Sequence, residues 1–127
     1  MDKNNLKPNK KIIEIKNGDK NIELQVILVK LLKVNNLKNG NKITTYQVAD
    51  ESGSIHCNFF DNVSNFIKEG DILFITGAYS SLFEDHIVLY QPKIGHGHVT
   101  KIGEFFFTFS LKPNISEPKI SQQNNNI

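Results

Sequence analysis

The alternation of apolar and polar residues predicts that most of this chain forms β-strands. In residues 53–60, every second side chain from Ile55 to Phe59 is apolar, and the opposite set, from Ser54 to Phe60, is polar except for its last member. Since successive side chains of a strand point to opposite faces, the first set marks a core face and the second a solvent face. A large aromatic residue, Phe60, therefore stands where a polar one is expected.

Similar runs, rich in β-branched residues and bounded by Asn-Gly or Gly turns, predict further strands. Four of them cover residues 22–34, 42–50, 72–83 and 86–90, and one more extended segment covers residues 103–110. A short helical turn is expected over residues 61–67, between the third and fourth strands. The Gly-His-Gly-His sequence of residues 95–98 is typical of a flexible loop.

Short strands separated by turns are typical of a small β-barrel or a β-sandwich, which the pattern alone does not separate. Gly77 lies inside the fourth strand, where a glycine indicates a bulge or a sharp bend. Because long strands of small barrels curl between two halves of the sheet, this bend favours the barrel.

The length of 127 residues suits one domain with one core. Polar ends predict a flexible N-terminal arm over residues 1–11 and a polar tail over residues 111–127, which leaves residues 12–110 for the folded domain. No run approaches the ~20 apolar residues of a membrane span, and no apolar segment of a secretion signal follows the first charges. The lone Cys57 excludes an internal disulfide and lies on the inward face, as a buried thiol of a cytosolic or nuclear protein would.

Charge is distributed unevenly along the chain. Residues 1–42 hold ten of the 15 Lys and four acids, whereas the remainder holds five Lys and nine acids. A basic front half indicates either a nucleic-acid footprint or a solvated arm. The sequence contains no Arg. Since Arg makes the commonest base contact in duplex DNA, sequence-specific reading of a duplex is disfavoured.

Phe60 is one of four aromatic residues that strand alternation places on the solvent face. The set comprises Phe60, Tyr79, Phe83 and Tyr90. Antiparallel pairing of the last two strands would set Tyr79 beside Tyr90 and Phe83 beside His86. Some of these rings could instead close the barrel ends or lie under loops. As a cluster they indicate a binding surface for unpaired bases, since stacking is worth roughly 1–3 kcal/mol per base.

Three lysines, Lys33, Lys38 and Lys42, flank the first hairpin, where they could meet phosphates or simply be solvated. Catalytic motifs are not found in the sequence: neither a nucleophile with a base and an orienting group nor a Gly-rich phosphate loop occurs. His96 and His98, with a single Cys in the chain, do not match zinc-ligand spacing. We therefore expect a binding protein, with no catalytic residues, no metal and no cofactor.

Several motifs resemble the B subunit of the SOSS complex, a family of small eukaryotic single-stranded DNA-binding proteins that act in the DNA-damage response. They occur in the family's order between residues 13 and 118: QVADESGSIHCNFFDN, GDI, YSSLF, LY, KIGEF and PNISEP. The resemblance implies an all-β chain with a single OB-fold, a five-stranded Greek-key β-barrel. It also implies stacking of single-stranded DNA with little sequence preference, a role in double-strand break repair, and a nuclear location.

The resemblance also assigns roles to individual residues. The family's four base-stacking aromatics correspond to the set above, with Phe60 in the position of the usual Trp. Lys93 corresponds to a basic contact with DNA in the loop after the fifth strand. Glu104 and Phe105 correspond to the contact with the large scaffold subunit, although the apolar run 105–107 also suits a core. The family's long Pro/Gly-rich tail is not found in these residues, so the resemblance does not assign the partners of that tail to this chain.

Two alternatives remain open from the residues. An OB-fold that serves only protein contacts would bury the four rings or turn them toward a partner. An RNA-binding OB-fold would use the same stacking rings, and no residue in the sequence identifies a reader of the 2′-hydroxyl.

Overall fold

A computed structural model of the chain describes residues 7–104 and 108–117, and it is predominantly β. A 3-10 turn at Ile12–Glu14 precedes the sheet, and helix α1 spans Asp61–Phe66. The strands are β1 (Ile22–Asn36), β2 (Lys42–Asp50), β3 (Gly53–Phe60), β4 (Asp71–Phe83), β5 (His86–Tyr90) and β6 (Val99–Glu104). The start of the predicted N-terminal arm (1–6), Phe105 and most of the predicted tail (118–127) lie outside the described residues.

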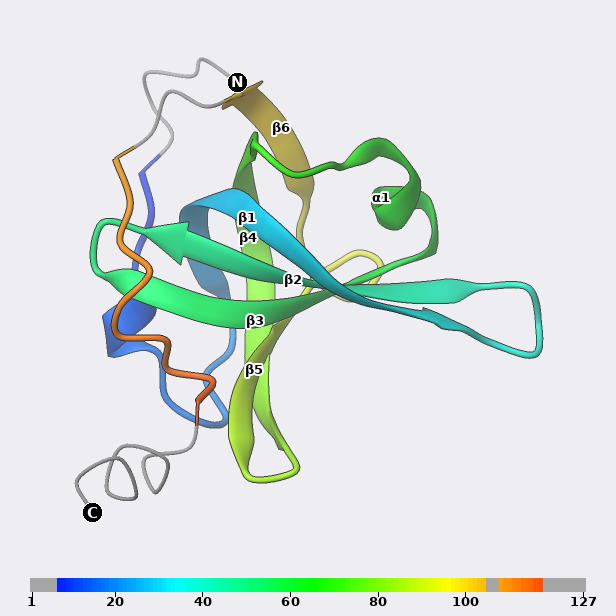
Figure 1. The fold of residues 1–127 in the computed structure, drawn as a ribbon, viewed down its shortest axis with the longest axis horizontal. Helices are drawn as coiled ribbons and strands as arrows, with labels where there is room; N and C mark the ends of the chain where they lie inside the picture. Colours follow the sequence, from blue (N-terminus) through cyan, green and yellow to red (C-terminus); the bar gives the residue numbers. More distant parts are fainter. Residues whose placement is uncertain (1–6, 105–107, 118–127) are drawn as a thin grey trace.

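Five of the strands form a closed ring, in the order β1-β2-β3-β5-β4 and back to β1 (Figure 1). All neighbours are antiparallel except β3 and β5, which run parallel. The prediction of five strands with a helical turn between the third and fourth is confirmed in these elements. The β1–β2 hairpin projects well beyond the ring (Figure 1).

Strand β4 closes the ring because it serves two partners in succession. Its first half, from Ile72 to Ala78, pairs with β1, and its second half, from Tyr79 to Phe83, pairs with β5. Gly77 lies at the changeover with φ +74°, a left-handed conformation that glycine adopts without the steric cost of a Cβ. The expected bend is therefore present, and the closed ring excludes a sandwich of two separate sheets.

The core fills the inside of this ring. Alternation along β3 is as predicted: Ile55, Cys57 and Phe59 are fully buried, while His56 and Phe60 are partly exposed. Burial of an aromatic side chain such as Phe59 contributes up to about 3 kcal/mol to stability. Burial also raises the pKa of the Cys57 thiol well above its ordinary value, so the thiol is held neutral.

The prediction of an extended segment over residues 103–110 is wrong in its boundaries. The strand in this region is β6, which pairs with β4 from Ile75↔Val99 to Asp71↔Glu104. By Ser110 the chain has crossed to the end of β2, where its N–H donates to the Asp50 carbonyl at 2.8 Å. An open edge of β4 decides where the strand forms, and the local apolar pattern does not.

The first residues of the predicted polar tail lie against the ring. Asn114 forms a parallel bridge with Ser54, and the Ile115 N–H donates to the Ser54 carbonyl at 2.9 Å. Ser116 is 2% exposed and joins two strands: its Oγ accepts from the His56 N–H and donates to the Ile87 carbonyl, each at 2.7 Å. In Figure 1 this orange segment runs along the ends of β2 and β3. In the described part of the chain, no helix is long and apolar enough to span a membrane.

Candidate nucleic-acid interface

Three aromatic rings form a column across the outer face of β3, β5 and β4. Tyr79 and Tyr90 are directly paired across β4 and β5, and their rings stack with centroids 5.2 Å apart and planes 12° apart. Phe60 stacks on Tyr90, the β5 member of this pair, with centroids 6.5 Å apart and planes 20° apart. We refer to Phe60, Tyr90 and Tyr79 as the aromatic column.

The side chain of Gln91, the residue after β5, sets the position of Phe60 in this column. Gln91 follows Tyr90, and its Oε1 accepts a hydrogen bond from the Phe60 N–H at 2.8 Å. The Gln91 N–H donates in turn to the Asn58 carbonyl at 3.1 Å. These bonds extend the short parallel pairing of β3 with β5 by one residue, which brings Phe60 beside Tyr90.

The column is already packed. A base inserted between two parallel rings would need about 7 Å, twice an ordinary contact of ~3.5 Å. Both separations are shorter, 5.2 Å for Tyr79 with Tyr90 and 6.5 Å for Phe60 with Tyr90. The uncovered ring faces and edges of the column are therefore its free surfaces, and a flat group would fit between Phe60 and Tyr90 only if one ring moved.

A hollow of about 470 Å³ lies beside the column, and we refer to it as the groove. Its lining comprises Leu32, Lys33, Asn35, Ile43, Thr45, His56, Asn58, Phe60, Phe83, Val88 and Tyr90. Phe83 is 55% exposed and stands opposite His86 on the neighbouring strand, as the sequence predicted. Val88, which alternation along β5 places on the same face as Tyr90, is only 5% exposed and lines the groove.

The four predicted lysines lie in two different places, two beside the aromatic residues and two on the projecting hairpin. Lys33 on β1 lines the groove, and the Lys93 ammonium lies over the Tyr79 ring, 5.4 Å from its centroid. Lys42 stands opposite Asn36 near the outer end of the hairpin, and Lys38 lies in its loop. The structure thus brings two of the four to the aromatic residues and places the other two on the projecting arm.

The charge of the groove is uniform in sign. Among the described residues that line it, Lys33 and His56 can be cationic and none is a carboxylate. Burial, and secondarily the neighbouring His86, holds the pKa of His56 below its usual range, so this imidazole is neutral at pH 7. Sequence reasoning placed His56 on the solvent face but gave it no part in the site.

Glu104, predicted to contact a scaffold, is part of an ion-pair network. Its Oε1 lies 2.7 Å from the Lys68 Nζ and 2.8 Å from the Lys101 Nζ, and both lysines also reach the fully buried Asp71 carboxylate. The two lysines lower the pKa of Glu104 to about 2. Glu104 is thus held ionised at the end of β6, while Phe105, the other predicted contact, lies outside the described residues.

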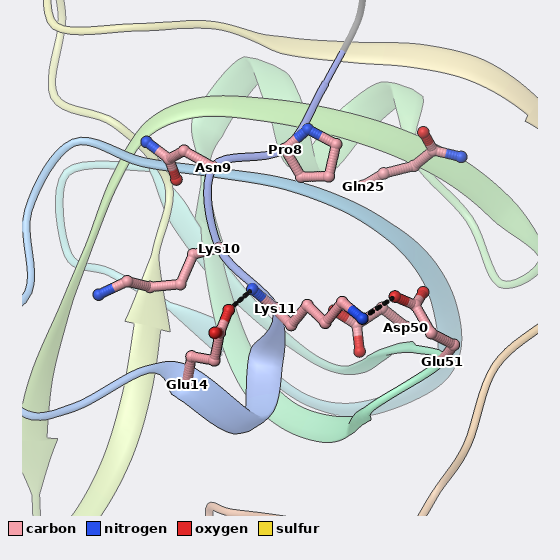
Figure 2. Close-up of a pocket in the computed structure, with 8 residues that line it drawn as sticks. All are labelled: Pro8, Asn9, Lys10, Lys11, Glu14, Gln25, Asp50 and Glu51. Carbon is pink, nitrogen blue, oxygen red and sulfur yellow. Dashed lines mark hydrogen bonds and ion pairs between the residues drawn. The ribbon is translucent and has the colours of Figure 1, made fainter.

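Another hollow lies beside the N-terminal segment, and carboxylates outnumber lysines in its lining (Figure 2). Glu14 accepts from the Lys11 N–H at 2.7 Å, and the Lys11 ammonium lies 3.6 Å from Glu51. Asp50 accepts from the Ile12 N–H at 2.9 Å. Three carboxylates face two lysines here, Lys10 and Lys11, so the formal charge of this lining is negative, whereas the lining of the groove holds no carboxylate.

The described residues form no metal site, but they bring further cations to the aromatic column. Within residues 7–104 and 108–117, no three His, Cys, Asp or Glu side chains gather as a metal site. Lys20 and His96, which the sequence analysis did not assign to a site, line a third hollow together with Tyr79 and Lys93. The sequence offered no signal for Lys20, because its approach to Tyr79 depends on how the loop before β1 meets β4.

The path of the chain is shared with a known structure. No protein-family model matches the sequence. The solution structure of hypothetical protein F20O9.120 from Arabidopsis thaliana is similar to it, with a TM-score of 0.70 over 84% of this chain and 81% of that chain. Since the two sequences are 18% identical, the likeness concerns the fold: this chain has the backbone arrangement of that Arabidopsis protein.

Proposed function

We propose that this protein binds single-stranded DNA through the aromatic column and the groove, and that its closed ring is an OB-fold. The observation that carries the proposal is the outward aromatic set, three rings of which stack beside a groove without carboxylates. Flat rings suit unpaired bases of any sequence, and Lys33 and Lys93 suit the phosphates between them. Lys38 and Lys42 would reach the strand from the projecting hairpin.

A single strand fits this surface better than a duplex. The stacking faces of bases are covered in a duplex, so rings such as Tyr90 and Phe83 would have no partner there. Lysine without arginine also favours phosphate attraction over reading of base edges. Low sequence preference follows, since every base has a stacking face.

We further propose that the protein serves in the nucleus as the DNA-binding subunit of a SOSS-like complex in the DNA-damage response. The motif resemblance supports this assignment, and Glu104 and Phe105 would dock on the large scaffold subunit. Lys68 and Lys101 hold Glu104 in place beside β6, so a partner would meet an oriented carboxylate with its charge already shared.

Fluorescence anisotropy with labelled oligo-dT tests the binding proposal. We expect the Phe60→Ala/Phe83→Ala variant to lose roughly 2–6 kcal/mol of binding free energy, if the two stacking contributions add. Wild-type affinity should fall as salt rises, because bound lysines release counterions from the strand. Phe66→Ala is the matched control, since Phe66 is 52% exposed on α1 and does not line the groove.

Absence of wild-type binding to oligo-dT at low salt would overturn the proposal and favour an OB-fold used for protein contacts. A loss for Phe66→Ala as large as that of the double variant would also contradict it. Oligo-rU measured in parallel separates DNA from RNA: tighter binding of oligo-rU would assign the groove to RNA.

A further inference from the structure

The third hollow, lined by Tyr79, Lys20, Lys93 and His96, lies at the Tyr79 end of the aromatic column. It measures about 220 Å³, and we refer to it as the end pocket. Tyr79 forms one side, and three groups that can carry positive charge, Lys20, Lys93 and His96, also line it. This volume lies below the roughly 300–1,000 Å³ of pockets for drug-sized ligands, so the pocket suits one small chemical group.

One wall of the end pocket is the loop before β1, which Ser80 fixes to β4. The Ser80 N–H donates to the Asp19 carbonyl at 2.9 Å, and the Gly18 N–H donates to the Ser80 carbonyl at 3.3 Å. The Ser80 hydroxyl donates to the Lys16 carbonyl at 2.5 Å and accepts from the Asp19 N–H at 3.1 Å. Ser80 is only 4% exposed, so these hydrogen bonds are shielded from water and hold the loop that carries Lys20 against β4.

The other wall is the loop after β5, which was expected to be flexible. Thr76 and His98 exchange two backbone hydrogen bonds, at 2.9 and 3.1 Å, that tie the loop to β4. Gly77 and Gly97 let the two backbones touch: a Cβ on Gly97 would lie 1.9 Å from the Thr76 carbonyl oxygen. The loop that carries Lys93 is therefore held against the strand that carries Tyr79.

The end pocket is acid-free as well as basic. Among its described lining residues none is a carboxylate, and neither Lys20 nor Lys93 has an ion pair with a described residue. The nearest acid in sequence, Asp19, is neutralised by Lys10, whose ammonium lies 2.7 Å from it. Hollows away from the column differ: one holds three carboxylates, and another holds Asp85 and Glu117.

We propose that the end pocket is a phosphate subsite, in which Lys20 and Lys93 bind a backbone phosphodiester of a strand whose neighbouring base lies at Tyr79. This inference rests on the proposed function and extends it by one nucleotide unit past the predicted contacts. The ligand is a phosphate because two lysines from opposite walls converge on a pocket without acids. The strand would then cross β3, β5 and β4 in order, from the groove along the column to the end pocket.

The test compares Lys20→Gln with wild type in anisotropy titrations of oligo-dT over a series of salt concentrations. Loss of one phosphate contact should reduce the slope of log affinity against log salt by about 0.7. The ratio of the wild-type affinity to the variant affinity then grows about 2.6-fold for each fourfold dilution of salt. Lys20→Arg should retain the wild-type slope, because it keeps the charge.

Lys11→Gln is the matched control, since it removes the same charge from the hollow of Figure 2, whose lining includes none of the aromatic column. Oligo-dT of increasing length distinguishes a strand phosphate from general attraction: the effect of Lys20→Gln should appear only above the length that reaches the end pocket. Equal slopes for Lys20→Gln and Lys11→Gln, or an effect independent of length, would overturn the subsite while wild-type binding still supports the groove. Failure of wild type to bind any oligonucleotide would overturn both proposals.

Discussion

At the scale of single residues, two adjacent phenylalanines on β3 have opposite surroundings. Phe59 is fully buried and meets Tyr46 edge to face, with ring centroids 6.0 Å apart. Phe60, one residue on, turns outward and stacks on Tyr90. The same side chain type therefore stabilises the core at one position and is available to a ligand at the next, because strand geometry reverses the face at each residue.

The protonation of His56 predicts a pH dependence of stability. Its pKa is lowered from 6.5, first by burial and then by His86, while Glu117 acts weakly in the opposite direction. Below pH 6.5 the unfolded chain binds a proton that the native protein resists. The free energy of unfolding is therefore retained above this pH and falls as the pH drops through the native pKa.

Urea unfolding at pH 7.5 and at pH 5.5 measures this effect. The His56→Gln variant should lose less stability than wild type between the two pH values, whereas His98→Gln, at an exposed position, should lose as much as wild type. The lowered pKa of Glu104 changes the free energy of unfolding only below pH 4.5, the ordinary pKa of this carboxyl, so it does not contribute between pH 7.5 and 5.5. The same decline in His56→Gln as in wild type would refute the assignment.

At the scale of elements, the crossing of β4 with the loop after β5 predicts a large asymmetry between two glycines. Gly77 and Gly40 both have positive φ, +74° and +87°. A Cβ on Gly77 would lie 1.9 Å from the His96 carbonyl oxygen, whereas one on Gly40 has no neighbour within 4 Å. Alanine therefore brings backbone strain at both positions and a steric clash at only one.

We expect Gly77→Ala to cost about 2–5 kcal/mol of unfolding free energy, the sum of strain and overpacking, and Gly40→Ala about 1–2 kcal/mol. Chemical denaturation of the two variants beside wild type provides the comparison. Similar losses for both would mean that the contact between β4 and the loop is not needed for stability.

At the scale of the whole molecule, the ring is closed with the help of residues beyond its last strand. The parallel seam of β3 and β5 pairs only three residues on each side, from His56↔Val88 to Asn58↔Tyr90. Ser116 continues the seam where this pairing ends, by joining the His56 N–H to the Ile87 carbonyl. Closure of the ring thus depends on chain segments about 60 residues apart in sequence.

Ser116→Ala should therefore destabilise the protein by about 1–3 kcal/mol, because the His56 N–H and the Ile87 carbonyl lose their partner at a buried position. Ser81→Ala, at an exposed position of β4, should change stability by less than about 0.5 kcal/mol. Thermal or urea unfolding of both variants measures this difference. A Ser116→Ala variant as stable as wild type would show that the pairing of β3 with β5 does not need the Ser116 hydrogen bonds.

The sequence by itself determined the five strands of the ring and the alternation of buried and outward side chains along β3. Period-two alternation identified the buried Phe59 and the outward Phe60, and it paired Tyr79 with Tyr90, because these features follow from local strand geometry and a short turn. The bend at Gly77 was predictable for the same reason: a glycine inside a strand is a local signal.

Only the tertiary structure decided how distant segments meet. Three features join residues that are far apart in the chain: the pairing of β6 with β4, the hydrogen bonds of Ser116 to β3 and β5, and the position of Lys20 and Lys93 beside Tyr79. The local sequence pattern carries no information on such contacts. Stacking of Phe60 on Tyr90 likewise required β3 to lie parallel to β5, which follows from ring closure. These arrangements are determined by burial and hydrogen bonding over the whole barrel, which depend on residues that only the folded chain brings together.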